Sequence, residues 1–481
     1  MVKSLICIFF ACFFYINFLF TQNTNTIISH RTYSPEALSE DVKILEDVLL
    51  NVHPSIDYYH SLEWYKNYFD TSLVIHQSMT EKEFRVFLKK KLKVLQCGHT
   101  SILPSRQYQR YLSKKTFRSI PYYLAYFEPY LINIRGFKKE DTLLKSLDTI
   151  LSLNNLSINE IADEFEDLLY VDAKSFEARN ELLQKNLMFY YFGLYEQDSV
   201  LISFKNLSKS NIYIREKEYK YLSNDLWKLK SDTLMQKYGG KYHCGVYLDK
   251  NKKIYYMKIK AFSGISMKAF FRKTFRKLQK NNTEVLILDL RNNPGGKISQ
   301  CLNLLSYLLP AKDTLFYETR IQRMKHKKYL GKKLEFRIIH LFMKLKKKKN
   351  NEYYIEQIHV NKKYPFTKKL YIITNCNTFS AANLVAVYLS QKRPNTKIVG
   401  TPTSGALWGS NAVSFLKLTL PNTKIRIFIP TFRIYHNLDH LSKEQKLNPV
   451  LPDIPNNYSP FDYLYKKDKA LESIYQDLMK Q

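Results

Sequence analysis

The chain has 481 residues, of which 45% are hydrophobic and 25% are charged. This length is too great for one hydrophobic core, so we expect roughly two or three domains, and the composition excludes a disordered chain. Lys and Arg number 75 against 43 Asp and Glu, a formal net charge of +32. No zinc finger, basic zipper or aromatic RNA-binding motif accompanies the charge. We therefore expect no nucleic-acid partner, while association with a membrane surface stays open.

The first residues have the pattern of an export signal. Lys3 precedes an apolar run from Leu5 to Phe20, and polar residues begin at Thr21. The run is shorter than the roughly 20 apolar residues of a membrane-spanning helix. We predict a signal peptide at residues 1–22 and a periplasmic or secreted protein, with an uncleaved membrane anchor as the alternative.

Residues 23–105 carry two helix patterns. Ser34 is typical of a residue that caps a helix start, and apolar residues then recur at three- and four-residue spacing. Thr80 begins a second helix with capping-box spacing, and this helix leads to Cys97-Gly98-His99-Thr100. We predict an N-terminal helical module that ends in this histidine motif.

Residues 106–235 show short mixed patterns. Residues 149–153 have the composition of a strand, and Asn154-Asn155 follows as a tight turn. Residues 158–169 repeat apolar side chains at helical spacing. These patterns predict a small β-rich module with one helix.

From about residue 240 the pattern changes to strands that alternate with helices. Residues 254–259 are predicted as a strand, and apolar runs at 285–288, 370–373 and 397–399 predict strands that are buried on both faces of a parallel sheet. Helices are predicted at 267–279, which is basic and amphipathic, at 298–308 and at 381–389. The pattern predicts an α/β core over 240–481, interrupted by a solvated insertion at 320–362 that carries a lysine run.

The four cysteines beyond the signal lie far apart and lack Cys-x-x-Cys spacing. This predicts buried side chains with at most one disulfide, and no structural zinc site.

Two segments that follow predicted strands carry residues suited to chemistry. The first, Asp289 to Gly296, ends in two glycines whose N–H groups can approach an anion closely. The second contains Ser380 at a strand-to-helix transition, where the positive end of the helix dipole stabilises a negatively charged nucleophile. The alternatives are a simple glycine turn and a hydroxyl that only caps the helix.

These segments, VLILDLRNNPGG at 285–296 and YIITNCNTFSAA at 371–382, resemble the signature segments of peptidase family S41. This family comprises the carboxyl-terminal processing (tail-specific) and tricorn-type serine peptidases. Further similar segments follow in the same order at 400–405, 420–423 and 449–454, where 420–423 is similar to a late strand. The resemblance implies an α/β core with a ClpP/crotonase-like open sheet, an N-terminal helical module, and a degenerate PDZ-like domain at 106–235.

The resemblance also assigns roles to individual residues. It implies Ser380 as the nucleophile, with an oxyanion hole formed by the backbone N–H of Ala381 and that of Gly295 or Gly296. It implies no metal and no cofactor.

The choice of general base decides the subtype. Family members with a Ser–Lys pair carry the lysine where this chain has Ala406, so the resemblance points to the tricorn-like members and to His99. A neutral histidine can accept the serine proton. The chain departs from the family at Cys97, where aspartate is common. Glu444 is the candidate for the carboxylate that orients the base.

We therefore expect an exported serine endopeptidase that acts on proteins or peptides. A catalytically inactive relative that binds peptides or other ligands is the alternative. An interaction protein held to anionic surfaces by its basic face is a third hypothesis.

Overall fold

The fold is described from a computed structural model of the chain. The structure describes residues 30–480 except 115–116, 137–142, 170, 196, 205–208, 214, 218–233, 235–236, 238–239, 320–324, 332–337, 339–340 and 342–352. The predicted signal peptide and the lysine run of the insertion lie outside the described residues. None of the helices within the described ranges has the length and apolar character needed to cross a membrane.

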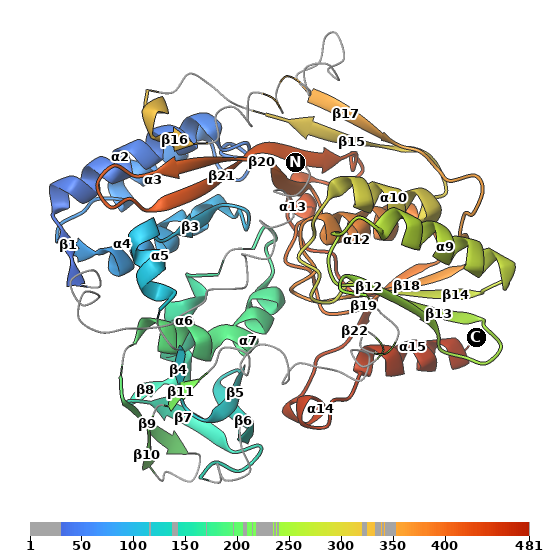
Figure 1. The fold of residues 1–481 in the computed structure, drawn as a ribbon, viewed down its shortest axis with the longest axis horizontal. Helices are drawn as coiled ribbons and strands as arrows, with labels where there is room; N and C mark the ends of the chain where they lie inside the picture. Colours follow the sequence, from blue (N-terminus) through green and yellow to red (C-terminus); the bar gives the residue numbers. More distant parts are fainter. Residues whose placement is uncertain are drawn as a thin grey trace.

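Helices near the N-terminus pack against a hairpin from the far end of the chain (Figure 1). The helices are α2 (Pro35–Val52), α3 (Leu62–Ser72) and α4 (Glu81–Leu92), and the hairpin strands are β20 (Gly409–Thr419) and β21 (Arg426–His436). Ser34 caps α2, and Thr80 forms the predicted capping box of α4. Strand β3 (Ser101–Leu103) pairs with β21, which brings the chain just after His99 to the hairpin.

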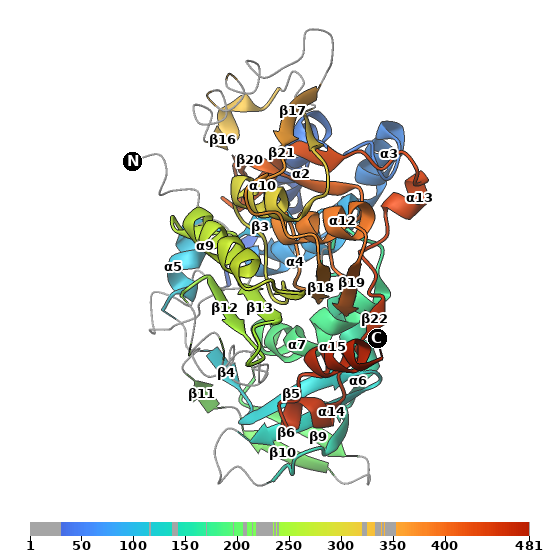
Figure 2. The same ribbon diagram turned by 90° about the vertical axis from the view of Figure 1, so that its right-hand side faces the viewer.

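The middle region forms a sheet with two helices. Its strands are β5 (Tyr122–Phe127), β6 (Tyr130–Gly136), β7 (Thr149–Leu153), β8 (Leu156–Ser157), β9 (Ser199–Phe204) and β10 (Lys209–Tyr213), and its helices are α6 (Ile158–Glu166) and α7 (Phe176–Leu194). The strand order is β10-β9-β7-β6-β5, with β8 paired to β7. Asn154 and Asn155 both have positive φ and form the predicted turn. The second helix, α7, was not predicted; it lies between the strands of the middle region and the α/β core (Figure 2).

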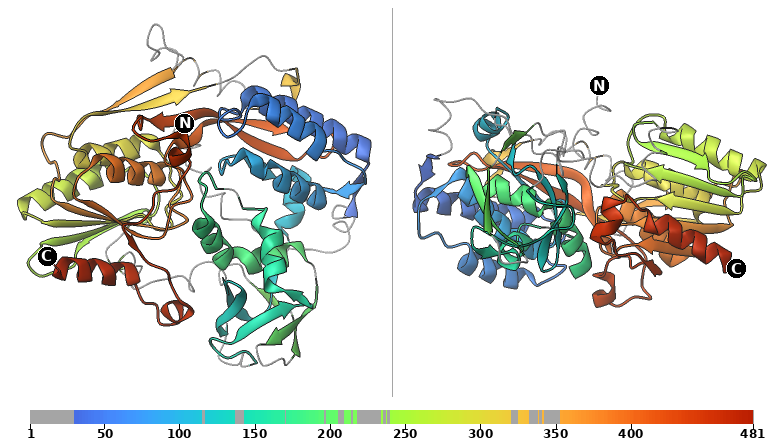
Figure 3. Two further views of the ribbon diagram at one scale, coloured as in Figure 1. Left: turned by 180° about the vertical axis from the view of Figure 1, so that it is seen from behind. Right: turned by 90° about the horizontal axis from the view of Figure 1, so that it is seen from below.

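The α/β core contains a mainly parallel sheet of order β12-β13-β14-β18-β19-β22. Its strands are β12 (His243–Tyr247), which is antiparallel, β13 (Ile254–Ile259), β14 (Val285–Asp289), β18 (Lys369–Thr374), β19 (Thr396–Gly400) and β22 (Ile454–Pro455). Helices α9 (Met267–Lys280), α10 (Ile298–Leu308) and α12 (Ala381–Lys392) cover one face, and α15 (Lys469–Met479) covers the other. The predicted strands and helices of the core are present, and Figure 3 shows their two-sided arrangement from behind and below.

Part of the predicted insertion at 320–362 belongs to a sheet of the core. Strand β17 (Tyr353–Ile358) pairs with β15 (Asp313–Glu318), which itself pairs with β21. Segment 420–423, likened to a late strand, instead lies in the turn between β20 and β21, because Pro421 lacks the N–H that a strand ladder needs.

The remaining elements are short. They are β1 (Thr32–Tyr33), β2 (Met79–Thr80), η2 (Lys93–Leu95), α5 (Arg106–Leu112), β4 (Phe117–Ser119), β11 (Arg215–Lys217), η4 (Lys327–Tyr329), β16 (Leu330–Gly331), α13 (Lys443–Lys446) and α14 (Pro460–Leu464). The four cysteines beyond residue 22 are buried and unbridged.

Candidate active site

Ser380 lies in the sharp turn between β18 and α12. Its backbone has φ 53° and ψ −124°, a strained conformation for a residue with a side chain. Its hydroxyl makes no capping bond to α12, so the helix-cap alternative does not hold. Instead, Oγ lies 3.1 Å from Nε2 of His99. A sharp strand-to-helix turn of this kind projects a serine hydroxyl away from the sheet.

The Ser380 loop (residues 375–380) is bonded to the glycine-bearing segment after β14. The N–H of Phe379 donates to the carbonyl of Asn293 at 3.0 Å. The hydroxyl of Thr378 donates to the carbonyl of Leu290 at 3.0 Å. The two sequence motifs, about 80 residues apart, therefore form one rigid unit at the carboxyl ends of neighbouring parallel strands.

The ring of His99 is held between two aromatic side chains. Its centroid lies 4.7 Å from that of Phe379 and 6.4 Å from that of Phe415, with small interplanar angles. Only 1% of His99 is exposed. Burial lowers the pKa of His99 to about 3, which keeps the ring neutral and lets Nε2 accept the Ser380 proton.

Behind His99 lies a carboxylate that the sequence patterns did not indicate. Oδ2 of Asp172 is 3.8 Å from Nδ1 of His99. The hydroxyl of Ser410 lies 3.3 Å from Nδ1 and 3.4 Å from Oδ2 of Asp172, so it bridges the two groups. Oδ1 of Asp172 accepts the N–H of Gly98 at 2.6 Å. The contacts form a line from Ser380 through His99 to a buried carboxylate.

Asp172 comes from the middle region, in the connection between α6 and α7. Its backbone N–H donates to the carbonyl of Ser404, and its carbonyl accepts the hydroxyl of Tyr59 at 2.8 Å. Burial raises the pKa of Asp172 to about 7, against the opposing hydrogen bonds from Gly98 and Ser410. No motif surrounds Asp172, and the departure at Cys97 was the one sign in the sequence that a carboxylate had to come from elsewhere.

Glu444 does not join this network. It lies exposed on the short helix α13, where its carboxylate accepts the hydroxyl of Ser442 at 3.1 Å. Glu444 is exposed to solvent, whereas the groups around His99 are buried, so Glu444 lies apart from the predicted site. Asp172 lies beside His99, where Glu444 was predicted to lie.

Two of the three expected oxyanion donors are available. The N–H of Gly295 donates to Oδ1 of Asn293 at 2.9 Å and is therefore engaged. Across the described ranges, the N–H groups of Gly296 and Ala381 have no acceptor. Gly295 has φ +99°, and a Cβ there would lie 2.6 Å from Cβ of Ser380 and 2.8 Å from the nitrogen of Ala381. Glycine at 295 thus keeps space open beside the Ser380 hydroxyl.

The position of a lysine base is filled by a small, buried residue. Ala406 is fully buried, and its carbonyl accepts the side-chain amide of Asn383 at 3.0 Å. No group of three His, Cys, Asp or Glu side chains with metal-binding geometry occurs within the part of the chain that the structure describes.

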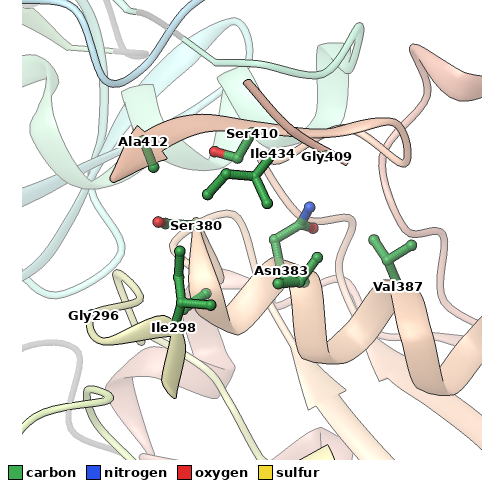
Figure 4. A pocket seen from close by; sticks show the side chains of 11 residues that line it. Gly296, Ile298, Ser380, Asn383, Val387, Gly409, Ser410, Ala412 and Ile434 are labelled. Carbon is green, nitrogen blue, oxygen red and sulfur yellow. The ribbon is translucent and has the colours of Figure 1, made fainter. Parts of the chain in front are cut away.

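A cavity that is open to solvent adjoins the Ser380 hydroxyl (Figure 4). It lies between α12 and the strands β20 and β21. Its apolar lining consists of Ile298, Ala381, Leu384, Val387, Ala412 and Ile434; glycines, Ser380, Asn383 and Ser410 complete it. None of the described residues that line this cavity has a charged side chain.

Comparisons with known proteins agree with the fold. The model of peptidase family S41 matches residues 253–455. A mutant of CPAF aligns with a TM-score of 0.60 at 14% identity, over 90% of this chain and 94% of that chain. Mature CPAF complexed with lactacystin aligns with a TM-score of 0.59 at 15% identity, over 92% and 97%. The tricorn protease has a TM-score of 0.40 at 14% identity, over 92% of this chain and 37% of that chain. No curated protein sequence matches the chain.

Proposed function

We propose that this chain, whose residues 253–455 match the model of peptidase family S41, is a serine endopeptidase that cleaves proteins or peptides through an acyl-enzyme on Ser380. The observation that carries the proposal is the 3.1 Å contact between Ser380 Oγ and His99 Nε2 within a strained turn. A serine that served only to cap the start of a helix would need neither the strained backbone nor the contact with a histidine.

The proposed reaction begins with attack of Ser380 Oγ on the carbonyl carbon of the scissile bond. The hydroxyl proton passes to Nε2 of His99 as the new C–O bond forms. The N–H groups of Gly296 and Ala381 stabilise the resulting oxyanion. His99 then gives the proton to the leaving amine, the C–N bond breaks, and a water molecule hydrolyses the acyl-enzyme in the same way.

Asp172 and Ser410 support His99 from its other side. If Nε2 accepts the Ser380 proton, Nδ1 carries a hydrogen and donates to Ser410, whose hydroxyl donates to Asp172. This chain of hydrogen bonds fixes the tautomer of His99. The carboxylate stabilises the imidazolium that forms during attack.

The cavity beside Ser380 supports a proposal about the substrate side chain that binds next to the scissile bond. Its apolar lining and lack of charge favour an uncharged aliphatic side chain next to the scissile bond. We further propose that the sheet of the middle region is a degenerate PDZ-like domain. An extended substrate segment would pair with an edge of that sheet, a mode of binding that tolerates many sequences.

The inactive alternative is less well supported. A binding protein would have no use for a strained serine, a buried neutral histidine and a carboxylate in line. Export and tricorn-like subtype are also proposals. Export rests on residues 1–22, and the subtype rests on His99 together with Ala406 in place of a lysine.

The proposal is tested with a fluorophosphonate probe. We expect the probe to label Ser380, and His99→Ala to reduce the labelling rate by about 10³-fold or more, because the proton acceptor is lost. Mass spectrometry of the labelled peptide identifies the modified residue.

His436→Phe is the matched control, because His436 is also fully buried but is not placed against Ser380. This variant should label like the wild type. Absence of labelling in the folded wild type would favour the inactive alternative. Full labelling of His99→Ala would remove His99 as the base.

A further inference from the structure

Glu181 belongs to helix α7 of the middle region, yet its carboxylate contacts the Ser380 loop. Oε2 accepts the backbone N–H of Cys376 at 3.0 Å and the hydroxyl of Thr401 at 2.6 Å. Oε1 accepts the ammonium of Lys185 at 2.5 Å and lies 3.4 Å from the amide nitrogen of Asn375. One carboxylate therefore joins the middle region to the loops after β18 and β19.

Cys376 strengthens the same junction. Its side chain is fully buried and belongs to the hydrophobic core of the middle region rather than to that of the α/β core. The Ser380 loop is thus anchored in the middle region twice, by the side chain of Cys376 and by its N–H on Glu181. Both anchors are formed four residues before Ser380.

Hydrogen bonds join this junction to the glycine-bearing segment (residues 289–296). The amide of Asn375 donates to Oδ1 of Asn292 at 2.9 Å, and Oδ1 of Asn375 accepts the N–H of Asn292. Asn292 lies three residues before Gly295. A shift of the Ser380 loop at Cys376 would therefore disturb both the serine and its neighbouring N–H donors.

We propose that Glu181 is a positioning residue that holds the Ser380 loop in the geometry in which Ser380 Oγ meets His99. This inference rests on the proposed function. It also connects the two carboxylates, because Asp172 lies in the segment that leads into α7, which begins at Phe176. The middle region then supplies the carboxylate behind His99 as well as the anchor of the serine.

The charge of Glu181 suits this role. Burial opposes its ionisation, but the ammonium of Lys185 and hydrogen bonds from Thr401 and Cys376 lower its pKa below the ordinary value. An ionised carboxylate can accept all four donors at once, whereas a neutral amide cannot. Removal of Glu181 alone would take its carboxylate away from the half-buried ammonium of Lys185 and destabilise the fold.

The test therefore uses the double variant Glu181→Gln with Lys185→Met, which removes both charges and keeps the side-chain volumes similar. We expect kcat on an apolar peptide substrate and the rate of fluorophosphonate labelling to fall about 100-fold. KM should change by less than about threefold, since the cavity is untouched. Hydrogen exchange at the Cys376 amide should accelerate at least about tenfold, because a charge-assisted bond is lost.

Tyr191→Phe is the matched control. The Tyr191 hydroxyl accepts the side-chain amide of Asn154 at 3.2 Å, so this variant removes a hydrogen bond from the same helix at a position ten residues beyond Glu181. Its kcat should equal that of the wild type. The inference is overturned if the double variant labels at the wild-type rate, or if its loss appears only in KM or melting temperature.

The two proposals fail in different ways. If the folded wild type does not react with the probe, the peptidase proposal fails. Hydrogen exchange at the Cys376 amide then still decides whether Glu181 fixes the loop. Unchanged exchange in the double variant would reject the positioning role, whatever the activity.

Discussion

At the scale of single residues, the site depends on a carboxylate that no motif marks. Asp172 is fully buried, and its hydrogen bonds come from Gly98 and Ser410. Glu444 has the residue type expected from the family but lies in solvent. Burial decides between them, since a carboxylate stabilises an imidazolium far more strongly away from water.

Asp172→Asn should lower kcat by about 10²- to 10⁴-fold, because the amide keeps an acceptor for Gly98 but carries no charge to stabilise the His99 imidazolium. Glu444→Gln is the comparison and should retain wild-type kcat. Steady-state kinetics on a peptide substrate measures both. The opposite pattern, with Glu444→Gln impaired and Asp172→Asn active, would return the orienting role to Glu444.

At the scale of elements, strand β20 determines the shape of the cavity above α12. The helix supplies the floor next to Ser380, and the strand brings Ala412 and Ser410 across it (Figure 4). Ala412 has a small side chain at this place. Under the proposed function, specificity would depend on a hairpin that also packs with the N-terminal helices.

Ala412→Leu should narrow the cavity and change the preferred substrate. We expect kcat/KM for a peptide with leucine at the scissile bond to fall about 10- to 100-fold relative to the same peptide with alanine, because the added methyl groups occupy the space that leucine needs. The ratio of the two kcat/KM values in one variant cancels any general loss of activity. An unchanged ratio would show that the substrate side chain binds elsewhere.

At the scale of the whole molecule, three buried histidines make the fold sensitive to acid. His53, His99 and His436 each have a pKa lowered to about 3, mainly by burial. The unfolded chain protonates these rings below about pH 6.5, whereas the folded chain resists protonation until about pH 3. The unfolded state thus binds more protons in this window, and each histidine makes stability decrease as the pH falls.

His436→Phe should flatten this dependence. Between pH 6 and pH 5 the free energy of unfolding of the variant should decrease by about 1 kcal/mol less than that of the wild type, since one proton uptake is removed. Within the described part of the chain, neither ring nitrogen of His436 has a hydrogen-bond partner, so phenylalanine removes no such bond there. Urea unfolding at both pH values measures the difference, and parallel slopes would contradict it.

The sequence by itself determined the local elements and predicted Ser380 and His99 as the reactive pair. Capping residues at Ser34 and Thr80 and the apolar runs of the core specify their helices and strands through short-range chemistry. Ser380 and His99 were found because each lies within a recognisable motif. The structure brings them into contact across 281 residues of chain.

Only the tertiary structure decided what surrounds this pair. Asp172 and Glu181 reach the site from the middle region and Ser410 reaches it from strand β20, and their importance comes from burial and distance rather than from neighbouring residues. The same holds for Gly295, whose N–H proved to be engaged by Asn293. Local patterns report which backbone shape a segment favours, whereas contacts between distant segments depend on how the hydrophobic clusters pack together.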